Sequence, residues 1–196
     1  MKLLFVRHGE TKGNIESGVY GRTDYPLTEK GEKEAHNSKK LIDSLTEDVK
    51  SIYSSGLTRA RQTANIIRPN KNVKIDERFT EFDFGIATEY PTLQEFKQDY
   101  PDAVETQNDR YPNGESSKEM LNRVVSGLND IVKNHNDSDT IIIITHGGPM
   151  FCLFEYIENY DFGEAPYINT SECVEIKYDG GEFRIISRHY NHNYTI

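Results

Sequence analysis

Two short, continuously apolar segments constrain the fold of this chain most. Residues 3–6 read Leu-Leu-Phe-Val and residues 141–144 are all Ile, so neither segment contains a polar residue. A strand in a parallel sheet is buried on both faces and has this continuous pattern, whereas a strand with one side in water alternates. Both segments are far shorter than the roughly 20 apolar residues of a membrane-spanning helix. They therefore predict two central strands of a buried sheet.

Segments with helical periodicity separate the predicted strands. The patterns predict helices over 28–45, 58–67 and 115–135, strands over 51–54 and 140–145, and helical structure after Pro149. Near the end of the chain, alternating apolar residues on both sides of Asp179-Gly180-Gly181 predict an antiparallel hairpin. Strands that alternate with helices favour an α/β fold. We expect a three-layer sandwich with a mostly parallel central sheet flanked by helices, and a C-terminal antiparallel hairpin.

Length and charge limit the class of protein. The 196 residues contain no internal repeat or linker, so we expect a single domain over 1–196. Acidic residues outnumber basic ones 32 to 23, and a chain with a net charge of −9 lacks the basic surface that nucleic acids and anionic membranes attract. Two cysteines, Cys152 and Cys173, provide no disulfide framework. The first apolar run ends after four residues at Arg7 and His8, which is too short for a signal peptide. We therefore expect a soluble, cytoplasmic protein with no nucleic-acid or membrane partner.

Histidines stand where the two buried strands are predicted to end. Arg7-His8-Gly9 follows the first strand and His146-Gly147-Gly148 follows the second. Ligands of such sheets bind beyond the carboxyl ends of the strands, and glycine lets a ligand approach the backbone closely. One histidine at a strand end is more often an ordinary loop residue, but two, each followed by glycine, favour a functional site.

A third polar segment adds positive charge to this predicted site. Arg59 lies in the first turn of the predicted helix 58–67, where the helix N-terminus favours anions and an arginine can grip a phosphate through two parallel bonds. Together with Arg7 and the two histidines it suits a dianionic phosphoryl group. These two histidines are not arranged with a neighbouring carboxylate or histidine at metal-ligand spacing, and the cysteines do not have zinc-finger spacing, so we expect neither a metal nor another cofactor.

These residues belong to a longer set of motifs. Arg7-His8-Gly9-Glu10-Thr11 with Asn14 resembles the signature of the histidine phosphatase superfamily, the phosphoglycerate mutase-like proteins. The resemblance continues in order over nearly the whole chain, at Gly21, residues 27–31, residues 54–64, Glu81 with Gly85, residues 112–116, His146-Gly147-Gly148 and residues 169–171.

The resemblance implies a role for each matching residue. His8 would attack phosphorus and form a phosphohistidine, in the neutral state that nearby arginine charges favour. Glu81 would protonate the leaving alcohol and then activate water, although Asp83, Glu89 and Glu115 are nearby alternatives. The phosphoryl oxygens would be held by Arg7, Arg59 and His146. The resemblance also implies substrate contacts at Asn14, Gly21 and Gly147, and leaves the role of Glu10 open.

Two departures from the family pattern concern the substrate pocket. Gly13 stands where many relatives have Trp, and Gly85-Ile86-Ala87-Thr88-Glu89 keeps only the first glycine of the frequent Gly-x-Trp-Glu-Gly. They imply a different pocket shape but leave the predicted phosphate site unchanged.

The charge of residues 81–115 bears on the type of reaction. Relatives that are mutases carry a longer insertion there, with basic residues that grip a second phosphate. This chain has nine acidic residues in that segment and only Lys97 and Arg110 as bases, which would repel a second phosphate. We therefore expect a metal-independent phosphatase of small phosphate monoesters. A cofactor-dependent phosphoglycerate mutase and a non-catalytic phosphate-binding protein remain the alternatives.

Overall fold

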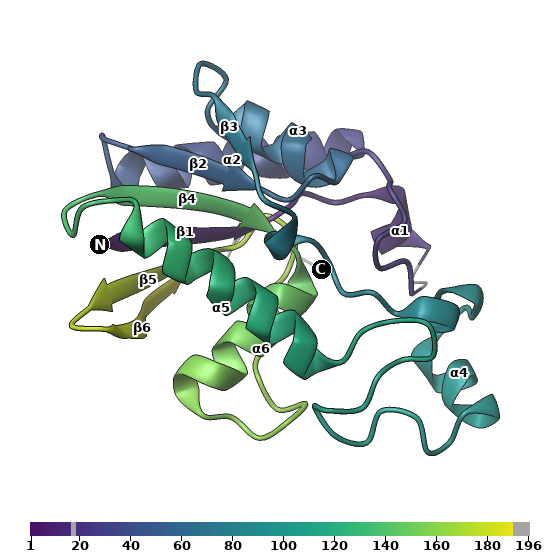
Figure 1. Cartoon of the computed structure of the whole chain (residues 1–196). Coiled ribbons are helices and arrows are strands. Elements are labelled where there is room, and N and C mark those ends of the chain that lie inside the picture. The colour runs from purple at the N-terminus through teal and green to yellow at the C-terminus, as the bar shows by residue number, and fades with distance from the viewer. Residues whose placement is uncertain (17–18, 190–196) are drawn as a thin grey trace.

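A six-stranded sheet forms the centre of the protein. The computed structural model describes residues 1–16 and 19–189, and its strands lie in the order β3-β2-β4-β1-β5-β6 (Figure 1). Neighbours among the first four strands run parallel, whereas β5 runs antiparallel to β1 and pairs with β6 in a terminal hairpin. The strands are β1 (Lys2–Arg7), β2 (Ser51–Ser54), β3 (Val73–Ile75), β4 (Thr140–Thr145), β5 (Cys173–Asp179) and β6 (Glu182–His189).

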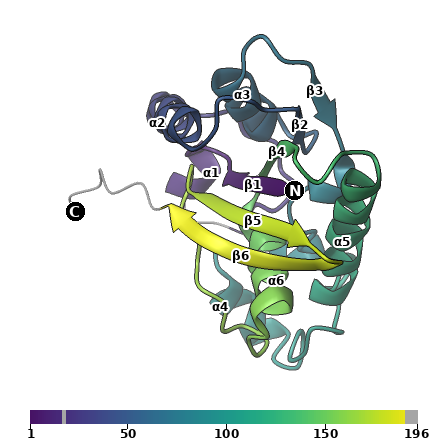
Figure 2. The ribbon, with the colours of Figure 1, turned by 90° about the vertical axis from the view of Figure 1, so that its left-hand side faces the viewer.

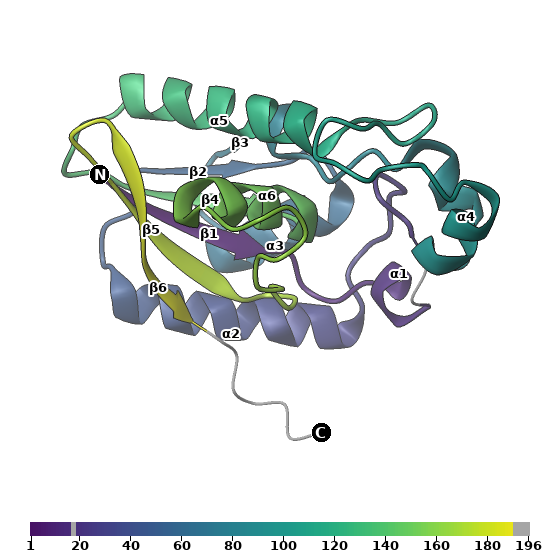
Figure 3. The ribbon, with the colours of Figure 1, turned by 90° about the horizontal axis from the view of Figure 1, so that it is seen from below.

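Helices cover both faces of this sheet. On one face lie α2 (Glu29–Leu45) and α3 (Thr58–Ile67), and on the other α5 (Ser117–Lys133) and α6 (Gly147–Glu158) (Figures 2 and 3). Along β1, Leu4 packs in the core shared with α2 and α3, and Leu3 in the core shared with α5 and α6. Both faces are therefore buried, which is the physical reason for the continuous apolar run. The expected three-layer α/β fold is confirmed.

The predicted helices differ from the observed ones by at most two residues at their ends, and α5 ends at Lys133 rather than at 135. Thr28 caps α2 as expected, through a hydrogen bond from the Gly31 N–H to its side chain. Helix α5 begins at Ser117, not at 115, because Ser116 and Glu119 form a reciprocal capping box. Short elements that the patterns did not predict are α1 (Lys12–Ile15), η1 (Glu77–Phe79), η2 (Gly85–Glu89), α4 (Leu93–Asp99) and strand β3.

The register of the parallel strands brings three polar segments to one edge of the sheet. Arg7 at the end of β1 pairs with Thr145 of β4, and Ser54 at the end of β2 pairs with Ile144. The residues that follow these strands therefore meet at their carboxyl ends. The segment that contains η2 and α4 extends beyond this edge (Figures 1 and 3). No helix among residues 1–16 and 19–189 is long and apolar enough to cross a membrane.

Candidate active site

His8 is held in a single tautomer directly after β1. Its Nδ1 lies 2.7 Å from the carbonyl oxygen of Gly9, and because a carbonyl only accepts, Nδ1 carries the proton. The lone pair is therefore on Nε2, which is buried and has no hydrogen-bond partner among the described residues. Burial, and after it the positive charges of Arg7 and Arg59, hold the pKa of His8 well below its ordinary value. His8 is therefore expected to be a neutral imidazole at neutral pH, with the lone pair of Nε2 unpartnered among the described residues.

His146 is the second neutral imidazole of the site. Its ring centroid lies 5.0 Å from that of His8, and its Nδ1 accepts a hydrogen bond of 3.2 Å from Nε of Arg59. Its Nε2 therefore carries the proton and donates to the hydroxyl of Ser55 at 2.6 Å. Burial and then the charge of Arg59 keep the pKa of His146 well below its ordinary value. The motifs did not single out Ser55, although it lies within the matching 54–64 segment.

Arg59 connects the histidines to the turn around Gly21. Its side chain is fully buried and donates from Nη2 to the carbonyl of Gly21 at 2.7 Å and from Nη1 to that of Thr23 at 2.8 Å. The guanidinium also lies 5.1 Å from the centre of the Tyr20 ring. At Gly21 φ is +43° and a Cβ would lie 2.8 Å from the carbonyl oxygen of Phe82, so only glycine fits this position.

Arg7 contacts a residue that no motif indicated. It is buried, and its Nη1 donates to the hydroxyl of Tyr167 at 2.6 Å and to the carbonyl of Ile168 at 2.5 Å. Its Nε is buried without a partner among the described residues, as is Nε2 of His8. The adjacent residues Arg7 and His8 thus each have a buried polar atom without a partner from the described chain.

Glu81 is placed beside these groups by backbone hydrogen bonds. Its Oε1 accepts from the N–H of Phe82 at 2.8 Å and from that of Gly148, in the first turn of α6, at 3.0 Å. Helix α6 begins directly after His146, so Glu81 contacts the start of the same helix that the second histidine precedes. Of the nearby acidic residues, Glu81 alone lines the large cavity described below.

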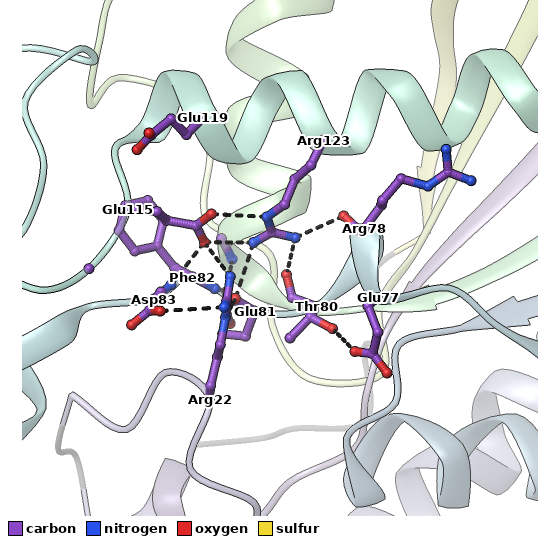
Figure 4. A network of polar contacts seen from close by, with 12 residues as sticks. Arg22, Glu77, Arg78, Thr80, Glu81, Phe82, Asp83, Glu115, Glu119 and Arg123 are labelled. Carbon is purple, nitrogen blue, oxygen red and sulfur yellow. Dashed lines mark hydrogen bonds and ion pairs between the residues drawn. The ribbon is translucent and has the colours of Figure 1, made fainter.

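The three alternative acids are engaged elsewhere or exposed. Glu115 accepts bonds from both Arg123 and Arg22 (Figure 4). Burial alone would raise the pKa of Glu115, but the hydrogen bonds and charge of Arg123, together with the Asp83 N–H and the charge of Arg22, hold that pKa below its ordinary value. Asp83 pairs with Arg22, and Glu89 is exposed in η2. An ionised carboxylate paired with arginine is a poor proton donor.

Asn14 and Glu10 make local contacts in this structure. The Oδ1 of Asn14 accepts from the backbone and hydroxyl of Thr11 in a capping box, and its Nδ2 donates to the hydroxyl of Tyr20 at 2.7 Å. Asn14 is not among the residues that line the cavity. Glu10 accepts from the Thr28 hydroxyl and from Lys30, and so joins the motif to the start of α2.

A cavity of about 540 Å³ adjoins these residues. Its lining includes four of the predicted site residues: Arg7, Gly21, Glu81 and Gly147. The rest of its lining is mainly aromatic and aliphatic, and includes Phe82, Phe84, Leu93, Val104, Tyr111, Met120, Phe151 and Phe162. His8, Arg59 and His146 are fully buried and are not among the lining residues.

The two departures from the family pattern have structural consequences. Many relatives have Trp at the position of Gly13. Here a Cβ at that position would lie 2.9 Å from the Tyr20 ring, so glycine leaves the space that Tyr20 occupies. Residues 85–89 do not line the cavity, and Ala87 packs in the core. The aromatic wall is formed instead by residues such as Phe82 and Phe84.

The side chains gathered here suit an anion. Guanidinium and imidazole groups surround the site, and the described ranges contain no group of three or more histidine, cysteine or acidic side chains placed to hold a metal ion. Planar guanidinium groups match the geometry and charge of a phosphoryl group.

Comparisons with known proteins show the family of this chain. The chain is 33% identical over 183 residues to "Uncharacterized phosphatase PhoE" of Bacillus subtilis, covering 92% of this chain and 88% of that protein. It is 28% identical to "Probable phosphoglycerate mutase GpmB" of Enterobacter, covering 91% and 93%. The solved structure of Bacillus stearothermophilus YhfR superimposes with a TM-score of 0.84 at 29% identity, covering 94% of each chain. The model of the histidine phosphatase superfamily (branch 1) matches residues 3–191, and the chain belongs to that family.

Proposed function

We propose that this protein is a metal-independent phosphomonoester phosphatase that acts through a phosphohistidine on His8. The observation that carries the proposal is the tautomer of His8. Its Nδ1–H donates a hydrogen bond to the carbonyl of Gly9, and its unprotonated Nε2 is buried and has no partner within the described chain. A nucleophile needs a free lone pair, and the neighbouring Arg7 and Arg59 supply the positive charge that a transferring phosphoryl group requires. The named phosphatase among the relatives supports the same class of reaction.

In the first step, Nε2 of His8 forms a bond to phosphorus while the bond from phosphorus to the ester oxygen breaks. Glu81, in its protonated form, gives its proton to the departing oxygen, so the alcohol leaves neutral. Arg7 and Arg59 compensate the negative charge on the phosphoryl oxygens. The phosphoryl group would replace the Tyr167 hydroxyl as a partner of Arg7, and His146 would contribute its Nε2 proton in place of Ser55.

In the second step, water hydrolyses the phosphohistidine. Glu81 is now a carboxylate and accepts a proton from the attacking water, whose oxygen bonds to phosphorus as the bond to Nε2 breaks. Inorganic phosphate leaves, His8 regains its free lone pair and Glu81 is again protonated. No step requires a metal ion.

The cavity indicates what the alcohol part of the substrate is like. An alcohol that leaves towards Glu81 enters a space walled mainly by apolar residues such as Phe84, Leu93 and Phe162. Among the described lining residues only Arg7 and Glu81 carry charge. We therefore propose esters with an apolar or aromatic alcohol part, because burial of apolar surface contributes about 25 cal/mol per Å² and charged or hydroxyl-bearing side chains are the minority of the lining.

A mutase is the second candidate function, favoured by the similarity to the probable phosphoglycerate mutase. A mutase must hold a bisphosphorylated intermediate, which needs cations around both phosphates. Within the described chain, Arg7 is the sole cation that lines the cavity, and residues 81–115 add nine acids against Lys97 and Arg110. An intermediate held at one end only would be hydrolysed or released, so the phosphatase is favoured.

The test is phosphate release by the purified protein from naphthyl, nitrophenyl, alkyl and glycerol phosphates, with and without EDTA. We expect hydrolysis of the aromatic and alkyl esters at rates that EDTA does not change. Activity that EDTA abolishes and zinc or magnesium restores would overturn the metal-independent mechanism. No release from any ester would instead favour a non-catalytic phosphate-binding protein.

A further inference from the structure

The segment that carries Glu81 has no regular secondary structure. It runs from the end of η1 at Phe79 to the start of η2 at Gly85. Backbone carbonyls in a helix or strand are bonded by neighbouring backbone N–H groups, but here other partners must supply these bonds. The side chains that do so determine where Glu81 lies.

Arg123 of α5 binds two carbonyls of this segment and one in the preceding η1. Its Nη1 donates to the carbonyl oxygens of Arg78 at 2.8 Å and Thr80 at 2.7 Å, and its Nη2 donates to that of Glu81 at 3.1 Å. Figure 4 shows its side chain extending from α5 towards this segment. One guanidinium therefore binds three carbonyls within four residues, including the carbonyl of Glu81 itself.

Glu115 holds Arg123 in this orientation. Its Oε2 accepts from Nε of Arg123 at 3.0 Å and its Oε1 from Nη2 at 2.7 Å, a two-bond pair that fixes the plane of the guanidinium. The same Oε1 accepts from the backbone N–H of Asp83 at 2.9 Å. Arg123 and Glu115 thus bind the backbone on both sides of Glu81.

Arg22 reinforces the pair from the other side of the segment. Its Nε donates to the carbonyl of Glu81 at 3.1 Å and its Nη2 to Oε1 of Glu115 at 3.1 Å (Figure 4). The Arg22 side chain is 43% exposed, against 18% for Arg123, so water competes more strongly for its bonds.

We propose that Arg123, held by Glu115, is a positioning residue for the general acid Glu81. By fixing the backbone on which Glu81 stands, it sets the distance from the carboxyl group to the leaving oxygen. The inference rests on the proposed function, because it takes Glu81 as the proton donor. The carboxyl end of the side chain is fixed separately by Phe82 and Gly148, so loss of Arg123 shifts the acid without removing it.

The test compares two leaving groups. Nitrophenol leaves with little help from an acid, whereas an alkyl alcohol needs protonation. We expect Arg123→Met to lower kcat for an alkyl phosphate about 100-fold and for nitrophenyl phosphate less than about 5-fold, because a shift of about 1 Å at a reacting group can cost 100-fold. Glu81→Gln is expected to show the same selectivity. In the double variant, Arg123→Met should lower kcat for the alkyl phosphate little further than Glu81→Gln alone does.

Two further variants keep the test interpretable. Arg123→Lys retains charge and helix propensity but cannot bind three carbonyls and Glu115 together, so it should be folded and show the same selective loss. Arg78→Gln is the matched control: Arg78 also bridges to α5, through Asp130, but its side chain binds no carbonyl of residues 80–83. It should keep the wild-type ratio of the two rates.

The outcomes separate the inference from the function on which it rests. Selective loss in both Glu81→Gln and the Arg123 variants supports the inference. Selective loss in Glu81→Gln with an equal loss on both esters in the Arg123 variants overturns it alone, and indicates a purely structural role. An equal loss on both esters in Glu81→Gln overturns the acid role of Glu81 and the inference with it.

Discussion

The carboxyl group of Glu81 and the backbone N–H of Gly148 are joined by a hydrogen bond of 3.0 Å. Gly148 is in the first turn of α6, so the positive end of that helix faces the acid. A Cβ at Gly148 would lie 2.4 Å from Oε1 of Glu81, closer than atoms can approach. The absence of a side chain at this position is therefore what lets the acid reach the helix that follows the His146 motif.

Substituting this glycine should move the acid. We expect Gly148→Ala to lower kcat for alkyl phosphates about 100-fold, because the added methyl group displaces the Glu81 carboxylate from its hydrogen bond. Nitrophenyl phosphate, whose leaving group needs little protonation, should lose much less. Steady-state kinetics of the variant with both esters checks this, and an equal loss on the two esters would show that displacement of Glu81 is not the cause.

The two buried histidines should make the protein less stable in acid. Their pKa values are lowered in the folded state, so below the unfolded value of about 6.5 the unfolded chain binds more protons than the folded one. The free energy of unfolding should then fall as the pH drops from 6.5 towards the folded pKa values, by roughly 1 kcal/mol per pH unit for each histidine. Above pH 7 this effect is absent.

Urea unfolding between pH 5 and 7.5 measures this dependence. Carboxylates such as Glu115 also lose stabilising charge in acid, so the informative quantity is the difference in slope between the wild type and His8→Asn. We expect the variant to lose about half of what the two histidines contribute to the slope of the free energy of unfolding against pH. Identical slopes would mean that folding does not shift the pKa of His8, and a steeper fall in the variant would mean that His8 is protonated in the folded protein; either result would contradict a neutral nucleophile.

The apolar cavity should control the choice of ester. Leu93 and Phe162 line it and are partly exposed, so serine at either position should be tolerated by the fold. We expect each substitution to lower kcat/KM for naphthyl phosphate about 10-fold and to leave glycerol phosphate within about 2-fold. Ile75→Ser, at an exposed apolar residue of β3 that does not line the cavity, is the control. A similar loss on both esters would contradict an apolar substrate site.

Mutase activity should be much slower than hydrolysis. With 2,3-bisphosphoglycerate supplied, we expect interconversion of 2- and 3-phosphoglycerate to be slower than release of inorganic phosphate, because the described lining offers no cation besides Arg7 for a second phosphate. Both rates can be followed in one reaction. Interconversion much faster than release would favour the mutase.

The sheet and its histidines could be predicted because each depends on local sequence. The apolar runs of β1 and β4 reflect burial on both faces, and His8 and His146 follow directly from where those strands end. The terminal hairpin likewise has its turn residues between its own strands. In each case the decisive contacts lie close along the chain or follow from strand order.

The contacts that complete the site could not be predicted in this way. Tyr167 binds Arg7 across 160 residues, and Ser55 binds His146 across 91. Arg123 lies on α5 between apolar positions and has the pattern of an ordinary solvated arginine, so nothing local indicates that it binds the segment of Glu81. Asn14 is the opposite case, because the spacing Thr11-x-x-Asn14 fits the local capping box that it forms.

The central claim is tested most directly by trapping the phosphoenzyme. A radiolabelled phosphate ester is mixed with the protein, quenched within milliseconds in alkali and separated from free label. We predict label on the wild-type protein that is stable in alkali and lost in acid, and greater accumulation in Glu81→Gln with a nitrophenyl ester, because hydrolysis of the intermediate then lacks its base. His8→Ala should carry no label and release no phosphate. Label that persists in His8→Ala, or turnover by that variant at the wild-type rate, would contradict the account.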